Sequence, residues 1–274
     1  MAIEKYAVIG HPIEHSKSPL IHQAFAQQFG KTIQYEKVLA PLDGFLATVK
    51  RLQVEGYLGA NVTVPFKFEA FDASQILAAR AQAAGAVNTL SFRDQCVTGD
   101  NTDGCGLVND ILKHQNASLA GQKVLLLGAG GAAQGVMQPV LEQKPLQLTV
   151  ANRSVDKAQT MVERFAADAK RSETSLLVQS FSELSQHYDV VINATSAGLT
   201  ESNLQLPAVI FQSNTLAYDM MYGRETPFMQ QARAAGAQVA DGLGMLVEQA
   251  AEAFYLWHGV RPDTAPVIKS FRQS

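Results

Sequence analysis

Short apolar segments alternate with longer amphipathic segments along the chain. The short segments are rich in Val and Ile and predict strands at residues 6–9, 33–39, 58–64, 123–127, 146–151, 190–193 and 215–220. The longer segments have helical periodicity and predict helices at residues 19–29, 42–54, 73–84, 103–114, 131–142, 155–165 and 243–257. Residues 86–91 and 95–98 predict a hairpin. Strands that alternate with helices are typical of an α/β fold with mainly parallel sheets.

A polar, turn-forming segment at residues 99–104 interrupts this alternation. We place a domain boundary there, because a second βα series begins beyond it. The last long helix is expected to return to the first domain. The sequence therefore predicts two α/β domains, one made of residues 1–104 plus 242–274 and the other inserted at residues 105–241. The length of 274 residues agrees with two domains.

Composition and charge exclude several classes of protein. Hydrophobic residues make up 47% of the chain and charged residues 17%, which excludes a mainly disordered chain. The formal net charge is −3 and the signs are interspersed, so we expect no partner nucleic acid and no anionic lipid surface. Residues 124–141 carry no charge, but they contain four glycines, two glutamines and Pro139, which argues against a membrane helix.

Cysteine usage and the N-terminal residues favour a cytoplasmic protein. Cys96 and Cys105 form neither a disulfide framework nor a Cys-x-x-Cys pair, which indicates a reducing compartment. Polar residues at 11–17 leave no room for the apolar core of a signal peptide. His11 and His15 are four residues apart, but Pro12 lies between them, so we expect no metal site. The composition is compatible with a monomer or a homodimer.

A glycine-rich turn follows the apolar segment at residues 123–127 and opens the next predicted helix. It has the G-x-G-x-x-A pattern of dinucleotide-binding proteins, in which the backbone approaches a pyrophosphate at a helix N-terminus. The residues expected to bind the cofactor here are Gly128, Ala129, Gly130, Gly131 and Ala132. The strand before, the helix after and another strand about twenty residues on support this interpretation. A purely structural glycine turn is the alternative.

The end of that next strand favours NADP over NAD. NAD sites usually place an acid there for the ribose hydroxyls, whereas this chain has Asn152, Arg153 and Ser154. The guanidinium of Arg153 can pair with a 2′-phosphate, and Asn152, Ser154 and Lys157 add hydrogen-bond donors. The alternative is that Arg153 is a solvated surface charge.

A second group of polar residues lies in the first domain. Alternation along a strand places Asn61 and Thr63 on one face, and Pro65 ends the strand just before Lys67. A lysine after a strand is usually a solvated charge. If Asp103 meets Lys67, however, the pair can exchange a proton with a substrate hydroxyl.

Several motifs together resemble one family. They occur in family order between residues 6 and about 260, at residues 15–19, 61–67, 85–89, 99–104, 128–132, 152–154, 192–196, 218–220 and 241–246. In this combination the chain closely resembles the shikimate dehydrogenases. The resemblance implies a substrate-binding domain and an inserted Rossmann domain that binds NADP. It also implies reversible reduction of 3-dehydroshikimate to shikimate by NADPH in aromatic amino acid biosynthesis.

The resemblance assigns roles to further residues. Lys67 and Asp103 are expected to be the catalytic pair. The residues expected at the substrate are Ser16, Ser18, Asn61, Thr63, Lys67, Asn88, Asp103, Tyr222 and Gln249. The residues added to the cofactor site are Met220, Gly242 and Met245. Two positions depart from many relatives, because Ala79 stands where they have an acid and Lys157 where some have Arg.

Two other functions are weighed against this one. A broader quinate/shikimate dehydrogenase that uses NAD is disfavoured by the missing acid after Val150. A non-catalytic NADP-binding sensor is disfavoured because Lys67, Asp103 and the polar substrate residues are all present.

Overall fold

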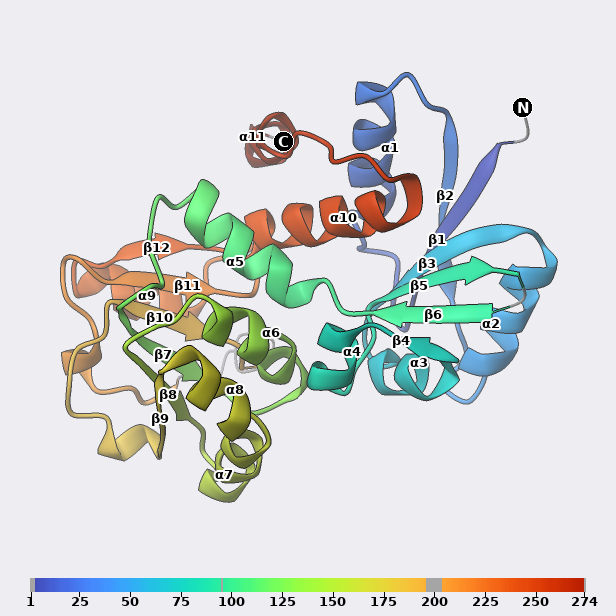
Figure 1. Ribbon diagram of the computed structural model, residues 1–274. Coiled ribbons are helices and arrows are strands. Elements are labelled where there is room, and N and C mark those ends of the chain that lie inside the picture. Colours follow the sequence, from blue (N-terminus) through green and yellow to red (C-terminus); the bar gives the residue numbers. More distant parts are fainter. Residues whose placement is uncertain (1–2, 95, 196–203, 274) are drawn as a thin grey trace. The chain divides into compact units, whose positions relative to one another are not determined.

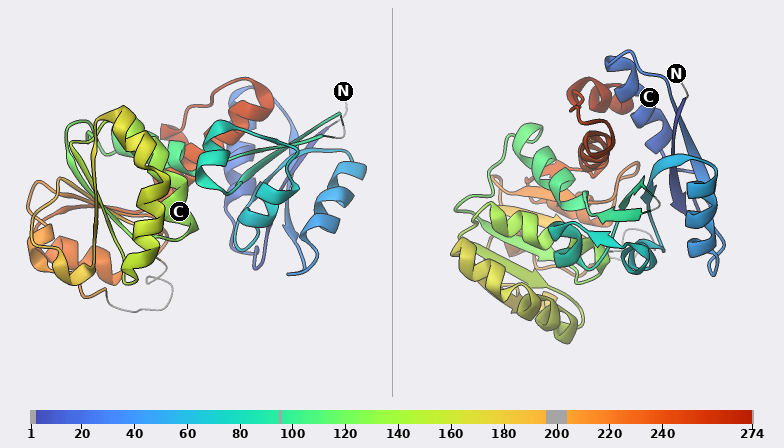
Figure 2. Two further views of the ribbon diagram at one scale, coloured as in Figure 1. Left: turned by 60° about the horizontal axis from the view of Figure 1, so that its bottom comes forward. Right: turned by 45° about the vertical axis from the view of Figure 1, so that its right-hand side comes forward.

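The computed structural model describes residues 3–94, 96–195 and 204–273 (Figure 1). The chain divides into two compact units, Met1–Gly106 with Val247–Ser274 (unit 1) and Leu107–Leu246 (unit 2). The chain passes between the units within α5 (Asp103–Lys113) and within α10 (Leu243–His258). Each unit contains one six-stranded sheet with helices on its faces (Figure 2). The predicted α/β fold class is confirmed.

The sheet of unit 1 has the order β2-β1-β3-β5-β6-β4. Its strands are β1 (Glu4–Gly10), β2 (Ile33–Leu39), β3 (Tyr57–Val62), β4 (Ile76–Leu77), β5 (Thr89–Arg93) and β6 (Cys96–Asp100). β1 pairs in parallel with β2 and β3, and β5 runs antiparallel to both β3 and β6. The helices of this unit are α1 (Ser18–Gln28), α2 (Phe45–Val54), α3 (Lys67–Ala73), α4 (Ala79–Ala84) and α11 (Ala265–Gln273).

Both faces of the unit 1 sheet are covered. Ala7 and Ile9 of β1 lie in one apolar cluster with Phe45 and Leu52 of α2. Alternate residues of a strand point to opposite faces, so Tyr6 turns the other way and stacks on Trp257 of α10, with ring centroids 4.7 Å apart. Coverage on both faces explains why β1 is apolar and buried from Tyr6 to Ile9.

The predicted helix at residues 73–84 is wrong in its first half. Residues 74–78 are not helical, because the Gln75 N–H donates to the Val97 carbonyl and the Ala78 N–H donates to the Gly99 carbonyl. These bonds place β4 beside β6, and only α4 remains helical. The helical composition of the segment is overruled by this tertiary pairing.

The sheet of unit 2 is parallel throughout, with the order β12-β11-β10-β7-β8-β9. Its strands are β7 (Lys123–Leu127), β8 (Gln147–Ala151), β9 (Ser175–Gln179), β10 (Val190–Asn193), β11 (Leu216–Asp219) and β12 (Gln238–Ala240). The helices of the unit are α6 (Gly131–Glu142), α7 (Val155–Arg164), α8 (Ala166–Ser172) and α9 (Pro227–Ala234), with short 3-10 turns η1 (Phe181–Glu183) and η3 (Ala208–Ile210). Strand order reverses between β7 and β10, which is where such sheets bind nucleotides.

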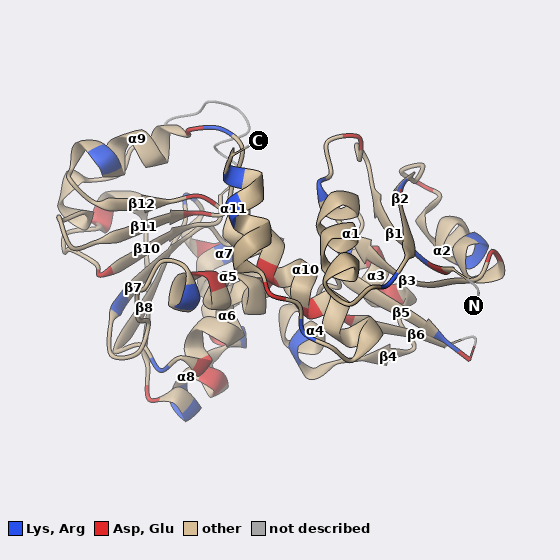
Figure 3. Ribbon diagram, turned by 90° about the horizontal axis from the view of Figure 1, so that it is seen from above, with Lys and Arg blue, Asp and Glu red and all other residues tan. Residues whose placement is uncertain are grey.

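Charge and hydropathy add little to this picture. Basic and acidic residues are interspersed over both units (Figure 3). Among the described residues, no helix has the length and apolar character needed to cross a membrane.

Candidate active site

The side chains of Lys67 and Asp103 form an ion pair in unit 1. Lys67 Nζ lies 2.6 Å from Asp103 Oδ2. The second carboxylate oxygen, Oδ1, accepts a 2.8 Å hydrogen bond from Asn88 Nδ2. The lysine side chain is 26% exposed and that of Asp103 12%, so the pair is partly shielded yet reachable from solvent. A lysine and a carboxylate at this distance can pass a proton between a substrate oxygen and solvent.

Local backbone bonds place both members of the pair. Lys67 begins α3, and its carbonyl accepts the Val87 N–H at 2.9 Å. Asp103 begins α5, and its N–H donates to Asn101 Oδ1 at 3.1 Å. The Asn101 amide in turn donates to the Ala86 carbonyl at 3.0 Å. Both catalytic candidates are therefore tied to the segment that connects α4 with β5.

Asn88 connects the pair to the other predicted substrate residues. Its Oδ1 accepts the Thr102 N–H at 2.9 Å, which orients the amide so that Nδ2 points toward Asp103. Gln249 Oε1, from α10, lies 3.2 Å from Asn88 Nδ2 and 3.3 Å from Thr102 Oγ1. The structure thus brings Lys67, Asp103, Asn88 and Gln249 together.

Asn61 lies beside this group, at the end of β3, and is buried. Its Nδ2 donates to the Asn88 carbonyl at 3.3 Å and to Thr89 Oγ1 at 3.1 Å. Its Oδ1 accepts a 2.7 Å hydrogen bond from the Tyr35 hydroxyl. Burial raises the pKa of Tyr35 well above its ordinary value, and a hydrogen bond with Ser18 opposes that shift. Tyr35 therefore connects Ser18 with Asn61.

Three of the remaining predicted substrate residues also belong to unit 1. Ser16 and Ser18 lie next to each other before and at the start of α1, with their hydroxyls 3.2 Å apart. The Thr63 N–H donates to the Ile9 carbonyl, which continues the pairing of β1 and β3 by one residue. Tyr222 belongs to unit 2, and burial raises the pKa of its hydroxyl.

The glycine turn after β7 has the geometry that the motif requires. Gly128 has φ +107°, and a Cβ there would lie 3.2 Å from the Ala194 carbonyl oxygen. Gly130 has φ −87°, and a Cβ there would meet open space. The turn leads directly to Gly131, the first residue of α6, whose N-terminal N–H groups favour an anion. These features fit the pyrophosphate of a dinucleotide.

The end of β8 carries no acid. Asn152 Nδ2 donates to the Ser154 carbonyl at 2.9 Å, which holds the turn that leads into α7. Arg153, Ser154 and Lys157 are exposed, so their donors are free to meet a phosphate. The donor set therefore fits the 2′-phosphate of NADP.

Two glycines bring the last predicted cofactor residues into place. A Cβ at Gly242 would lie 2.2 Å from the Met220 carbonyl oxygen, and one at Gly244 would lie 2.1 Å from Asp110 Oδ1. The Met245 N–H donates to the Tyr218 hydroxyl at 3.3 Å. That hydroxyl donates to Asp110 Oδ2 at 2.5 Å.

Sequence reasoning missed the residues that hold others in place. The sequence does not predict Tyr35, Thr102, Asp110 or Tyr218 as site residues. Thr102 and Tyr218 lie inside the family motifs at residues 99–104 and 218–220, which is a signal that could identify them. Tyr35 and Asp110 lay in a predicted strand and a predicted helix, and their partners are distant in sequence.

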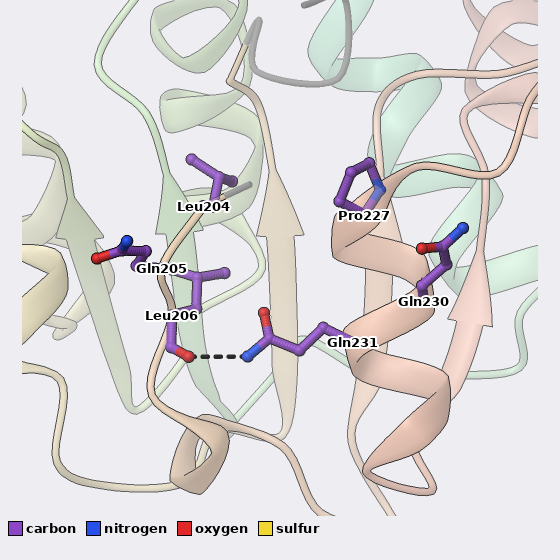
Figure 4. Close-up of a pocket in the computed structure, with 6 residues that line it drawn as sticks. All are labelled: Leu204, Gln205, Leu206, Pro227, Gln230 and Gln231. Atoms are coloured by element: carbon purple, nitrogen blue, oxygen red, sulfur yellow. Dashed lines mark hydrogen bonds between the residues drawn. The ribbon is translucent and has the colours of Figure 1, made fainter. Parts of the chain in front are cut away.

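Unit 2 also contains a cavity of about 300 Å³ (Figure 4). Its lining consists of Leu204, Gln205, Leu206, Pro227, Gln230 and Gln231. Gln231 Nε2 donates to the Leu206 carbonyl at 2.8 Å across it. The lining includes no charged residue and no predicted site residue, so the cavity offers no candidate for the chemistry.

The reversal of strand order at a glycine turn and a lysine–carboxylate pair are both typical of dinucleotide-dependent oxidoreductases. Three family models match the chain in agreement with this class. They describe a shikimate dehydrogenase substrate binding domain, a shikimate / quinate 5-dehydrogenase and a shikimate 5′-dehydrogenase C-terminal domain, at residues 8–90, 110–204 and 242–270. The chain belongs to the shikimate dehydrogenase family, which confirms the resemblance seen in its motifs.

Individual relatives agree with the family. The shikimate dehydrogenase (NADP(+)) of Methylobacillus flagellatus is 61% identical over 272 residues, which cover 98% of this chain and 99% of the relative. The crystal structure of an Ael1 enzyme from Pseudomonas putida is 45% identical, with a TM-score of 0.91 and 97% of each chain covered. Shikimate 5-dehydrogenase from Thermus thermophilus, solved in complex with NADP(H) and shikimate, is 31% identical, with a TM-score of 0.86 and 99% of each chain covered.

Proposed function

We propose that this chain catalyses the reversible, NADP-dependent reduction of 3-dehydroshikimate to shikimate. The observation that carries the proposal is the 2.6 Å pair of Lys67 Nζ and Asp103 Oδ2, surrounded by neutral hydrogen-bonding side chains. Relatives that match 98% or more of the chain are named for this NADP-dependent activity. A sensor that only binds NADP has no need for a proton-transferring pair.

Lys67 and Asp103 transfer the proton to and from the reacting oxygen of the substrate. When bound, NADPH supplies the hydride that reaches the carbonyl carbon of the substrate. The oxygen of that carbonyl gains negative charge, and Lys67 Nζ donates a proton to it. Asp103 Oδ2 holds the ammonium in place, and Asn88 holds the second carboxylate oxygen. In the direction of shikimate oxidation, the same pair removes the hydroxyl proton.

The substrate is expected to bind to unit 1. Asn61, Asn88 and Gln249 offer neutral amides to the ring hydroxyls. A site of this kind rejects an analogue that lacks one hydroxyl, because a buried amide is then left without its partner. Ser16 and Ser18 would supply hydroxyls for the carboxylate, and Thr63 is expected close to the amides. This assignment corresponds to a substrate-binding domain of residues 1–104 plus 242–274.

The cofactor is expected to bind to unit 2, in a domain of residues 105–241 with Gly242 and Met245 at its edge. The glycine turn at 128–132 would hold the pyrophosphate, and Arg153 would bind the 2′-phosphate with help from Asn152, Ser154 and Lys157. Met220 would contact the cofactor, and the flexible Met245 would pack against the nicotinamide. We place the enzyme in the cytoplasm, where the free thiols of Cys96 and Cys105 stay reduced.

Initial rates with four pairs of reactants test the proposal. Shikimate and quinate are each oxidised with NADP and with NAD, and cofactor reduction is followed by its absorbance. We expect turnover with NADP and shikimate, and far lower rates with the other three pairs. Comparable rates with NAD or quinate would assign the chain to the broader-specificity dehydrogenases. Tight NADP binding without any turnover would favour the sensor.

A further inference from the structure

The guanidinium of Arg80 makes a bidentate contact with the carboxylate of Asp100. Asp100 is the first residue of the segment 100–103 that leads into α5, which we call the Asp103 loop. Arg80 Nε lies 2.6 Å from Asp100 Oδ1, and its Nη2 lies 2.9 Å from Asp100 Oδ2. The arginine side chain is 23% exposed and that of Asp100 11%. Such a fork fixes the plane of the carboxylate as well as its distance. Asp100 therefore has one orientation set from α4.

The third nitrogen of the same guanidinium reaches α10. Arg80 Nη1 lies 3.0 Å from Glu252 Oε1, and it also contacts Cys105 Sγ at 3.1 Å. Burial alone raises the pKa of Glu252, but hydrogen bonds and charges from Arg261 and Arg80 outweigh that effect and lower it. Glu252 thus stays ionised and attracts Arg80. Arg261 contacts its other oxygen from the surface at 2.6 Å.

The contacts of Arg80 with Asp100 and with Glu252 lead to different parts of the candidate site. Asp100 Oδ1 also accepts the Asn101 N–H at 2.7 Å, and Asn101 Oδ1 accepts the N–H of Asp103. Glu252 lies three residues after Gln249, so the two side chains share one face of α10. The side chain of Arg80 is therefore connected both to the Asp103 loop and to α10, the helix that carries Gln249.

We infer that Arg80 is a positioning residue that holds the Asp103 loop and the Gln249 face of α10 in register around Asn88. This inference rests on the proposed function. Asn88 Nδ2 can contact both Asp103 Oδ1 and Gln249 Oε1 only while the two segments keep their separation. A lysine at position 80 would supply charge but could not contact both oxygens of Asp100 and Glu252 together. The guanidinium shape is what the position requires.

Variants that disturb the Arg80–Asp100 contact and the Arg80–Glu252 contact separately test the inference. In D100N the charge that orients the Asp103 loop is lost, and we expect kcat for shikimate oxidation to fall about 10-fold or more while KM changes little. In E252Q the contact between Arg80 and α10 is weakened, and we expect the KM for shikimate to rise about 3- to 10-fold while kcat changes little. R80K should show both effects. R51Q is the control, because it removes the exposed ion pair with Glu55 and shares no residue with this network, and both parameters should stay within about twofold of wild type.

The outcomes separate the inference from the proposed function. Circular dichroism and the NADP dissociation constant establish that each variant is folded. If the wild-type protein does not oxidise shikimate, the proposed function fails. If it does, but R80K keeps both parameters within about twofold, the inference is overturned. The same conclusion follows if D100N and E252Q lose kcat equally at unchanged KM, since that pattern reports only a smaller folded fraction. If R80K does not fold, the inference is tested by D100N and E252Q alone, with the outcomes given above.

Discussion

The Tyr35 hydroxyl donates a 2.7 Å hydrogen bond to Asn61 Oδ1, so a residue of β2 fixes the amide of a residue two strands away in the sheet order. Both side chains are buried. With the oxygen of Asn61 occupied, its Nδ2 is directed to the Asn88 carbonyl and Thr89 Oγ1. The orientation of a proposed substrate amide is thus determined by a residue outside the proposed substrate set.

Removal of this hydroxyl in Y35F should weaken substrate binding. The Asn61 oxygen loses its buried donor, which costs about 1–3 kcal/mol of stability and frees the amide to rotate. We expect the KM for shikimate to rise about 3- to 10-fold, with a smaller effect on kcat. Steady-state kinetics and urea unfolding measure the two effects. Y57F is the control, because the Tyr57 hydroxyl contacts Glu36 instead. An unchanged KM in Y35F would contradict the role of this contact.

Replacement of the catalytic lysine should abolish most turnover without loss of cofactor binding. In K67M the reacting oxygen loses its proton partner, so we expect kcat to fall about 10²- to 10⁴-fold. The NADP dissociation constant should not change, because the glycine turn belongs to unit 2. K50M removes an exposed lysine of α2 and serves as the control. Near wild-type turnover in folded K67M would refute the assignment.

An alanine at Gly130 should separate folding from cofactor binding. Its φ of −87° suits any residue and a Cβ there meets open space, so G130A should be at least as stable as wild type. The added methyl group would instead occupy the approach of the pyrophosphate, and we expect NADP to bind about tenfold more weakly or worse. G128A is the contrast, because φ +107° and the nearby Ala194 carbonyl make it destabilising. Unchanged NADP affinity in G130A would place the pyrophosphate elsewhere.

Loss of Arg153 should change cofactor preference. The exposed guanidinium is proposed to pair with the 2′-phosphate, which only NADP has. In R153A we expect the dissociation constant for NADP to rise about 10- to 100-fold while that for NAD changes little. Calorimetric titration with both cofactors measures this, with R171A on α8 as the control. Equal weakening of both cofactors would indicate that Arg153 contacts the adenine rather than the phosphate.

The sequence predicted features that depend on a few adjacent residues. The strand, glycine turn and helix around Gly128 are encoded within one segment, and so is the start of α5 at Asp103. Contacts between distant residues carried no such signal. Arg80 lies 20 residues from Asp100 and 172 from Glu252, and nothing in its own helix marks it as a bridge. The extended β4 and the edge strands β9 and β12 were missed because pairing with a neighbouring strand, rather than composition, creates them.

His22 should make the free energy of unfolding depend on pH. Its ring is fully buried in α1 and stacks on Tyr35, with ring centroids 4.4 Å apart. Burial, followed by the proximity of His258, lowers the pKa of His22 from 6.5 to about 3. The folded protein therefore keeps this ring neutral, whereas the unfolded chain takes up a proton below pH 6.5. Between pH 6.5 and about 3 the unfolded state binds more protons, so stability falls as the pH is lowered.

Linkage gives the size of the effect and a way to isolate it. A histidine with these two pKa values makes the protein about 2 kcal/mol less stable at about pH 5 than at about pH 8. H22L removes the titrating ring, so its stability should fall by about 2 kcal/mol less over that range. Urea unfolding at several pH values across that range measures the difference, and the exposed His187 provides the control variant H187Q. Parallel curves for wild type and H22L would show that His22 is already protonated in the folded protein, or that its titration is not linked to folding.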